Sequence, residues 1–150
     1  MVLAVSLMAL LASAATTTFP GGTIDVPEGC TAPANIAAFH DGFFASVKCP
    51  KEGLDILFYQ DTHIRDACRG TSDKSILAQR ESLQLPLPNG SFVVACTFTR
   101  KAESGKTSVE EMVIDLGPAQ LISQIRTPRQ AFLLLQIGMS FRAAKREPSK

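Results

Sequence analysis

The feature that most constrains this chain is its N-terminus, which has the pattern of a secretory signal peptide. Residues 1–11 are apolar apart from Ser6, and residues 12–14 are Ala-Ser-Ala, the small residues of a cleavage site. No Lys or Arg precedes the apolar run. The run is too short to span a bilayer, which takes about 20 apolar residues. We therefore expect residues 1–14 to be a signal peptide and the mature chain to begin near Ala15.

Export determines how the cysteines are interpreted, because disulfides form in oxidising compartments. The chain has four cysteines: Cys30, Cys49, Cys68 and Cys96. Two disulfides are expected, and the residues alone leave all three pairings open. No Cys-x-x-Cys occurs, and neither His40 nor His63 stands at zinc-finger spacing, so no metal site is expected.

The mature chain is patterned as short apolar strands separated by Gly, Pro, Asn and Asp. The expected strands are Thr23–Val26, Phe43–Cys49, Leu54–Tyr59, Leu83–Leu87, Phe92–Thr99 and Thr107–Leu116. Residues 60–81 are polar and predict mostly loop. Parallel sheets need helical crossovers, and the chain offers almost none of these before residue 117. The sequence therefore predicts an all-β fold: a single disulfide-stapled β-sandwich over residues 15–117.

The clearest local signal is Asn89-Gly90 between two apolar runs, which predicts a β-hairpin with a type I′ turn. Pro86 lacks an N–H group, so the strand before the turn is expected at a sheet edge or beside a bulge. Asn89-Gly90-Ser91 is also an N-glycosylation sequence. A purely structural use of Asn89 and Gly90, to make the turn, is an equally good interpretation.

The charges are unevenly distributed along the chain. From Thr16 to Gly117, nine Lys and Arg stand against thirteen Asp and Glu, a net charge of −4, whereas residues 118–150 hold six basic residues and one acidic residue, a net charge of +5. Residues 118–150 are therefore predicted to form a basic C-terminal tail, as an amphipathic helix or a disordered extension. An acidic body argues against a nucleic-acid-binding domain. The chain ends in Arg-Glu-Pro-Ser-Lys150, so no lipid-anchor signal is evident.

Several short motifs together resemble a known family. Lys-Cys-Pro-Lys at residues 48–51 ends one strand, Leu85-Pro86 follows later, and Ser-Phe-Val-Val-Ala-Cys at residues 91–96 comes next. These motifs, with Cys68 between them, resemble the SRS surface-antigen family of coccidian parasites, which is related to the six-cysteine domains of other apicomplexans. The resemblance covers Cys30 to about Gly117. It implies a compact β-sandwich on the parasite surface, used in attachment to host cells and in modulating host immunity.

The resemblance also implies a disulfide pairing. Family domains pair six cysteines first with sixth, second with fifth and third with fourth. By position, Cys30 and Cys49 match the first two, Cys68 the third or fourth, and Cys96 the fifth, while the sixth is missing near residues 107–109. The implied bridge is Cys49–Cys96, with Cys30–Cys68 as the remaining pair. Cys49–Cys96 would join two sheets and, by closing a loop of about 48 residues, contribute roughly 4 kcal/mol in the chain-entropy model.

The function expected from these features is binding rather than catalysis. The sequence contains no Gly-x-Ser-x-Gly, His-Glu-x-x-His or phosphate-binding glycine loop, so neither an enzyme nor a cofactor is expected. The expected partner is a glycan or protein receptor on a host cell, with Arg100, Lys101 and Lys106 as candidate glycan contacts and a homodimer as a further option. The expected location is secreted or at the cell surface. The alternative is a soluble secreted effector or small-ligand carrier, released without a membrane anchor.

Overall fold

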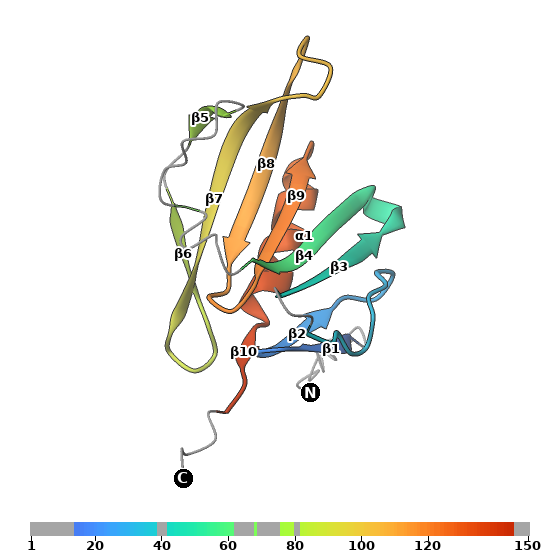
Figure 1. Cartoon of the computed structure of the whole chain (residues 1–150), viewed down its shortest axis with the longest axis vertical. Helices are drawn as coiled ribbons and strands as arrows, with labels where there is room; N and C mark the ends of the chain where they lie inside the picture. Colours follow the sequence, from blue (N-terminus) through green and yellow to red (C-terminus); the bar gives the residue numbers. More distant parts are fainter. Residues whose placement is uncertain (1–13, 39–41, 62–67, 69–75, 80–81, 146–150) are drawn as a thin grey trace, which may run out of the picture.

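The computed structural model describes residues 14–38, 42–61, 68, 76–79 and 82–145. The described chain is mostly β, and its strands form two sheets, so the predicted all-β, sandwich-like class is confirmed. The large sheet has seven strands (Figure 1). In spatial order they are β3 (Gly42–Cys49), β4 (Leu54–Asp61), β9 (Gln120–Ile125), β8 (Ser108–Asp115), β7 (Phe92–Lys101) and β5 (Ile76–Gln79), and β6 (Leu83–Pro86) also pairs with β7.

A second sheet of three strands and one α-helix complete the fold. The small sheet has the order β1-β2-β10, with β1 (Ala15–Phe19), β2 (Gly22–Val26) and β10 (Arg142–Ala143). The helix α1 (Pro128–Met139) crosses behind the large sheet in Figure 1, and a short 3-10 helix, η1 (Pro50–Glu52), joins β3 to β4. We call the face of the large sheet turned toward α1 and the small sheet its inner face, and the opposite face its outer face.

The main core lies on the inner face, between the large sheet, the small sheet and α1. Four phenylalanines from separate parts of the chain meet there: Phe19 lies with its ring centroid 4.7 Å from Phe58, 5.7 Å from Phe43 and 6.0 Å from Phe141. All four are at most 5% exposed. Aromatic rings bury large apolar areas, so this cluster is what joins β1 and the end of α1 to strands β3 and β4.

Helix α1 begins with a capping box. The Thr127 side chain accepts a hydrogen bond from the Gln130 backbone N–H, and the Gln130 side chain accepts one in return from the Thr127 N–H. Pro128 stands at the first turn, where its missing N–H costs no helical hydrogen bond. The helix packs closely on β8, because a Cβ at Gly138 would stand 2.8 Å from Ile114 Cδ1. Leu134 and Ile137 are fully buried in the same contact.

The predicted division at residue 117 is wrong, because the segment after it is integral to the fold. Strand β9 lies in the middle of the large sheet, paired with β8 on one side and β4 on the other. Residues 118–145 therefore supply a central strand, the helix and β10 rather than a basic tail. Residues 146–150 lie outside the described residues.

Part of the uneven distribution of charge along the sequence is balanced by ion pairs within the fold. Arg142 makes two hydrogen bonds to the carboxylate of Asp25, at 3.0 and 2.5 Å, and Arg129 pairs with Glu52 at 2.7 Å. The bond from Arg142 holds the pKa of the Asp25 carboxyl below its ordinary value. Two basic residues of the C-terminal segment thus pair with acidic residues of the body.

The disulfides differ from the implied pairing. The bridges are Cys30–Cys49 and Cys68–Cys96, with S–S distances of 2.05 and 2.11 Å. Cys49–Cys96 is wrong because both residues belong to one sheet, in strands β3 and β7, with β4, β9 and β8 between them. Four strand spacings are about 19 Å, whereas bridged cysteines need Cα atoms within about 7 Å.

The β6–β7 hairpin forms where it was predicted, with β6 at the edge of the sheet. Its turn is not type I′. The Gly90 N–H donates to the Leu87 carbonyl, which places Pro88 and Asn89 at the two central positions, and Gly90 follows with φ +83°. Proline cannot adopt the positive φ that a type I′ turn requires, so Gly90 alone provides the left-handed residue.

Candidate functional site: the outer face of the large sheet

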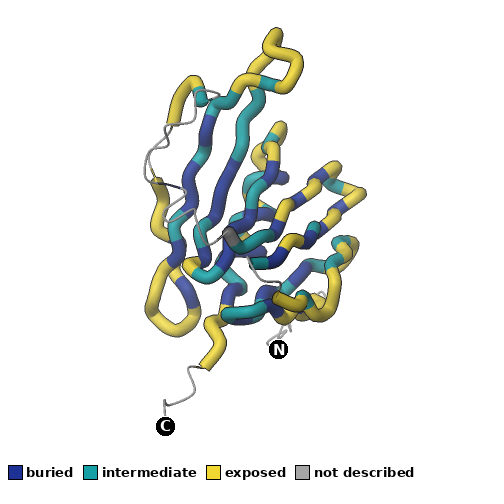
Figure 2. Tube along the Cα trace, viewed as in Figure 1, coloured by how far each residue is buried: buried dark blue, intermediate teal, exposed yellow. Residues whose placement is uncertain are grey.

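The outer face is divided into a covered half and an open half. One row of side chains crosses it, since Leu57 pairs with Ile122, Ile122 with Val113 and Val113 with Cys96. Residues directly opposite one another in antiparallel strands share a face. Val113 and Cys96 are each 2% exposed, Ile122 is half-buried, and Leu57 is 43% exposed. The burial of this row of side chains therefore decreases from β7 to β4 (Figure 2).

The covered half lies over β7 and β8. Cys68 is bonded to Cys96 there, and with Phe98 and Val113 the two cysteines form a small second core, all at most 8% exposed. The Gln79 side chain of β5 donates a hydrogen bond to the Cys68 carbonyl at 2.8 Å. The Cys68–Cys96 disulfide thus fixes Cys68 against this half of the sheet.

The open half lies over β3, β4 and β9. Its apolar side chains are Phe44, Leu57, Tyr59 and Ile122, which we call the open patch. Phe44 is 67% exposed and pairs directly with Tyr59, while Leu57 occupies the next outward position on β4. Contiguous exposed apolar side chains on one face are a feature of contact surfaces.

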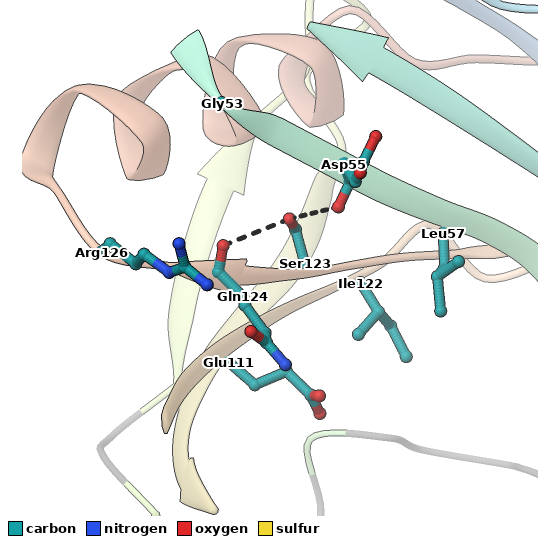
Figure 3. Close-up of a pocket in the computed structure, with 8 residues that line it drawn as sticks. All are labelled: Gly53, Asp55, Leu57, Glu111, Ile122, Ser123, Gln124 and Arg126. Carbon is teal, nitrogen blue, oxygen red and sulfur yellow. Dashed lines mark hydrogen bonds between the residues drawn. The ribbon is translucent and has the colours of Figure 1, made fainter. Parts of the chain in front are cut away.

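A hollow of about 410 Å³ opens beside the patch, where strands β4 and β9 separate (Figure 3). The two strands pair over only three residues, which end at Leu57 and Ile122. Beyond that point Ser123 bridges the gap, since its hydroxyl donates to the Asp55 backbone carbonyl at 2.6 Å. The hollow therefore has an apolar floor, Leu57 and Ile122, and a polar rim. The rim side chains are Asp55, Glu111, Gln124 and Arg126.

The separation of the strands is held by the start of α1. The buried Gln130 amide donates from Nε2 to the carbonyls of Glu52 and Gly53, at 2.8 and 3.3 Å, and its Oε1 accepts from the Arg126 N–H at 2.7 Å. One side chain thus fixes the β3–β4 connection and the end of β9 at once. The hollow is a built feature of the fold, because this bracket keeps β4 and β9 apart.

One buried polar group lies on the same face without a partner. Gln120 is 6% exposed and pairs with Tyr59 across β4 and β9, yet its Oε1 atom makes no hydrogen bond. Leaving a buried acceptor unsatisfied costs about 1–3 kcal/mol.

The candidate glycan contacts are not brought together as a basic cluster. Arg100 is paired with Glu111, with its Nε and a terminal nitrogen 3.1 and 3.0 Å from the same carboxylate oxygen. Lys101 and Lys106 are exposed on the β7–β8 hairpin, whose tip also carries Glu103. A site for polyanions needs concentrated positive charge, which this arrangement does not provide.

Groups able to carry out chemistry are few in the described part of the chain. Among residues that the structure describes, no three His, Cys, Asp or Glu side chains lie together as a metal site would need. His40 and His63 lie outside that part. Glu110 and Glu111 point to opposite faces of β8, since Glu110 accepts from Thr99 and Glu111 from Arg100. Within the same ranges, no helix has the length and apolar character to cross a bilayer.

Strand β9 was missed in the sequence, and a helix after residue 117 was expected only as one of two alternatives, although signals for both elements exist. Gly117-Pro118 separates two apolar runs, which is a hairpin cue for β8 and β9. Thr127-Pro128-Arg129-Gln130 before an apolar run is the pattern of a capping box. Recognition of these two patterns would have placed β9 and α1, and therefore the frame of the hollow.

No protein-family model matches the chain, and a search of curated proteins finds no match.

Proposed function

We propose that this chain is an exported binding domain that contacts a protein partner through the open half of its outer face. The observation that carries the proposal is the exposure of Phe44 and Leu57, 67% and 43%, beside the hollow. Aromatic and arginine side chains are enriched in protein–protein interfaces. The open patch supplies Phe44 and Tyr59, and the rim of the hollow supplies Arg126.

Export is supported by the two disulfides, which indicate folding in an oxidising compartment. Removal of residues 1–14 would leave strand β1 complete, because β1 begins at Ala15. Attachment to host cells, or modulation of host immunity, remains the specific role implied by the resemblance to surface antigens. The proposed function does not depend on a relationship to surface antigens, since the Cys49–Cys96 disulfide that the resemblance implies is absent.

A protein partner is favoured over an acidic glycan by the charges around the open patch. The rim carries two carboxylates, Asp55 and Glu111, and one guanidinium, Arg126. The rim therefore lacks the concentrated positive charge that a sulfated glycan needs, and its Glu111 is already paired with Arg100.

The test compares two variants of the full exported chain in binding to cultured animal cells, measured by flow cytometry. The double variant Phe44→Ala/Leu57→Ala should reduce bound protein at least tenfold. Phe132→Ala is the matched control, because Phe132 is 64% exposed but lies on α1, away from the outer face. Protease treatment of the cells should abolish binding, and enzymatic removal of sulfated glycans should leave it unchanged.

Three outcomes would contradict the proposal. Equal binding by Phe44→Ala/Leu57→Ala and Phe132→Ala would remove the open patch from the interface. Loss of binding after glycan removal alone would assign the partner to the glycan class. A dimer in light scattering that the double variant abolishes would assign the patch to a second copy of the chain.

A small-ligand carrier is the second candidate, and the volume of the hollow favours it. Binding pockets for small molecules measure about 300–1,000 Å³, and the hollow measures about 410 Å³. A carrier would lose its ligand on Ile122→Glu, which charges the floor, with Phe44→Ala unaffected. Native mass spectrometry of the secreted protein would show the bound molecule directly.

A further inference from the structure

The tip of the β6–β7 hairpin carries the only Asn-x-Ser/Thr sequence in the chain, Asn89-Gly90-Ser91. Such a sequence accepts an N-linked oligosaccharide only when it is accessible in the secretory pathway. It is also common in turns for purely conformational reasons. The geometry of the hairpin distinguishes these two uses.

The left-handed residue of the hairpin tip is Gly90, with φ +83°. The hydrogen bond of the turn, from the Gly90 N–H to the Leu87 carbonyl at 3.0 Å, puts Asn89 at the second central position, after Pro88. Asparagine is common in turns because its side chain bonds to the backbone two residues on. The role of Asn89 therefore depends on what its side chain contacts.

The Asn89 side chain is engaged with the third residue of its own motif. Its Oδ1 accepts from the Ser91 hydroxyl at 2.6 Å and from the Ser91 backbone N–H at 3.0 Å. A backbone N–H can only donate, so the atom facing it is the oxygen and the amide nitrogen Nδ2 points away. Among the described residues, no hydrogen bond is made by Nδ2. The serine hydroxyl that the motif requires is thus already in contact with the amide group that would be modified.

The tip is open to solvent. Asn89, Gly90 and Ser91 are all exposed, and a Cβ built on Gly90 would meet nothing within 4 Å. In Figure 2 the loop is drawn as exposed along its whole length and stands at the lower end of the molecule. An oligosaccharide on Asn89 would therefore displace no packed side chain of the described chain.

We infer that Asn89 carries an N-linked oligosaccharide in the exported protein, an inference that rests on the export part of the proposed function. The donor is an oligosaccharide joined to a lipid through pyrophosphate. The Asn89 Nδ2 forms a bond to C1 of the first sugar and gives up one proton, while the bond from C1 to the pyrophosphate oxygen breaks and the lipid pyrophosphate leaves. No oxidant or reductant is needed.

The position of Asn89 is compatible with the proposed binding surface. The β6–β7 tip lies at the lower end of the molecule in Figure 1, and the hollow is formed by the start of β4 and the end of β9, on the other side of the sheet's centre. The sugar would therefore leave the open patch accessible, and it would cover the hairpin edge, where Phe92 is 55% exposed.

The experiment expresses the full chain in cultured eukaryotic cells behind an added leader known to direct export. The secreted protein is run on a gel before and after treatment with an enzyme that removes N-linked glycans and converts their asparagine to aspartate. The wild-type band should shift down by one oligosaccharide, and peptide mass spectrometry should find aspartate at position 89. Secreted wild-type protein that does not shift, with Asn89 unmodified, would overturn the inference.

Three variants separate modification from folding. Ser91→Thr keeps the motif and should keep the shift. Ser91→Ala should lose it. Asn89→Asp keeps an oxygen acceptor for Ser91, so it should be secreted at wild-type yield and run at the deglycosylated position. A shift that persists in Asn89→Asp would also overturn the inference.

A parallel arm with the native N-terminus and no added leader tests export itself. Retention of this unprocessed chain in the cytosol would contradict the export part of the proposed function. The inference about Asn89 would still be tested by the protein that carries the added leader. The two failures are therefore distinguishable.

Discussion

The two halves of the outer face differ in how far their side chains are buried. On the β7–β8 side, Phe98 is 1% exposed and packs in one cluster with the Cys68–Cys96 disulfide. On the β3–β4 side, Phe44 is 67% exposed on the same face of the same sheet. Both are phenylalanines at outward positions of a strand. Phe98 packs with the Cys68–Cys96 disulfide in the small second core, whereas most of the Phe44 side chain is open to solvent.

This comparison shows why strand patterning alone does not locate a binding surface. Alternation of apolar residues tells which side chains share a face, but the cover of a face depends on segments distant in sequence. In β7 the residues from Phe92 to Cys96 are apolar on both faces, which is typical of a strand that is covered on both sides. In β3 the outward residues are Phe44, Ser46 and Lys48, a mixture that fits a face partly open to solvent.

The largest expected effect compares the two phenylalanines directly. Phe98→Ala should destabilise the protein by about 3–5 kcal/mol, since it leaves a cavity in the covered half. Phe44→Ala should change the free energy of unfolding by less than about 0.5 kcal/mol, because its side chain is largely in solvent. Urea denaturation of the secreted proteins measures both. Equal losses would mean that the two halves are covered alike.

The next prediction concerns the disulfide that holds Cys68 against the covered half. Cys68→Ala/Cys96→Ala should cost roughly 3–4 kcal/mol in the chain-entropy model and should also expose the outer face over β7 and β8. Cys30→Ala/Cys49→Ala is the matched control, since its loop has a similar length and Cys49 lies in the inner core. Both should lower stability, but only the first should increase amide exchange at Phe98 and Val113.

A smaller loss of stability is expected when an ion pair, rather than a buried apolar side chain, is removed. The small sheet closes the inner face, and Arg142 of β10 pairs there with Asp25 of β2. Arg142→Gln should lower stability at neutral pH by at most about 1 kcal/mol, because both side chains are partly exposed.

The pH dependence of this effect has a definite sign. The pKa of Asp25 is lowered in the folded state, chiefly by the hydrogen bond from Arg142, so its contribution to stability is complete above the ordinary value of 3.8. It is lost as the pH falls through the lowered pKa. Wild type and Arg142→Gln should therefore differ at pH 7 and converge as the pH falls below the lowered pKa of Asp25. A difference that grows toward low pH would contradict this assignment.

The smallest effect concerns the hairpin lysines, which belong to neither half of the outer face. Lys101→Gln/Lys106→Gln should leave stability within about 0.5 kcal/mol of wild type. Because Arg100 is already paired with Glu111, wild-type protein should leave a heparin column below physiological salt. Retention above physiological salt that the double variant abolishes would restore the hairpin as a glycan contact.

The parts of the fold that follow from short-range patterns were predictable. Five of the expected strands overlap β2, β3, β4, β7 and β8 closely, and the sixth corresponds to the edge strand β6. The Asn-Gly hairpin also forms, although Pro88 changes its turn type. These elements depend on residues within about ten positions of one another, which a sequence presents directly.

The missed elements depend on partners far along the chain. Strand β9 is placed by β4, some 60 residues earlier, as well as by its neighbour β8. The basic charge of residues 118–150 suggested a separate tail, but Arg129 and Arg142 are paired with Glu52 and Asp25 of the body. Charge asymmetry along a sequence can therefore mark complementary parts of one fold.

The disulfides illustrate the same limit. Three pairings satisfied the sequence, and the one implied by the resemblance would have required contact between β3 and β7 across three intervening strands. Cys49 faces the inner core and Cys96 the outer one. The order of strands in the sheet and the opposite faces of the two residues both exclude their bond.

A disulfide map of the mature secreted protein tests this division of the outer face most directly. Proteolysis without reduction, followed by mass spectrometry of the linked peptides, should recover Cys30 joined to Cys49 and Cys68 joined to Cys96. Peptides that join Cys49 to Cys96 would place β3 beside β7, and both the covered half and the open patch would then be wrong.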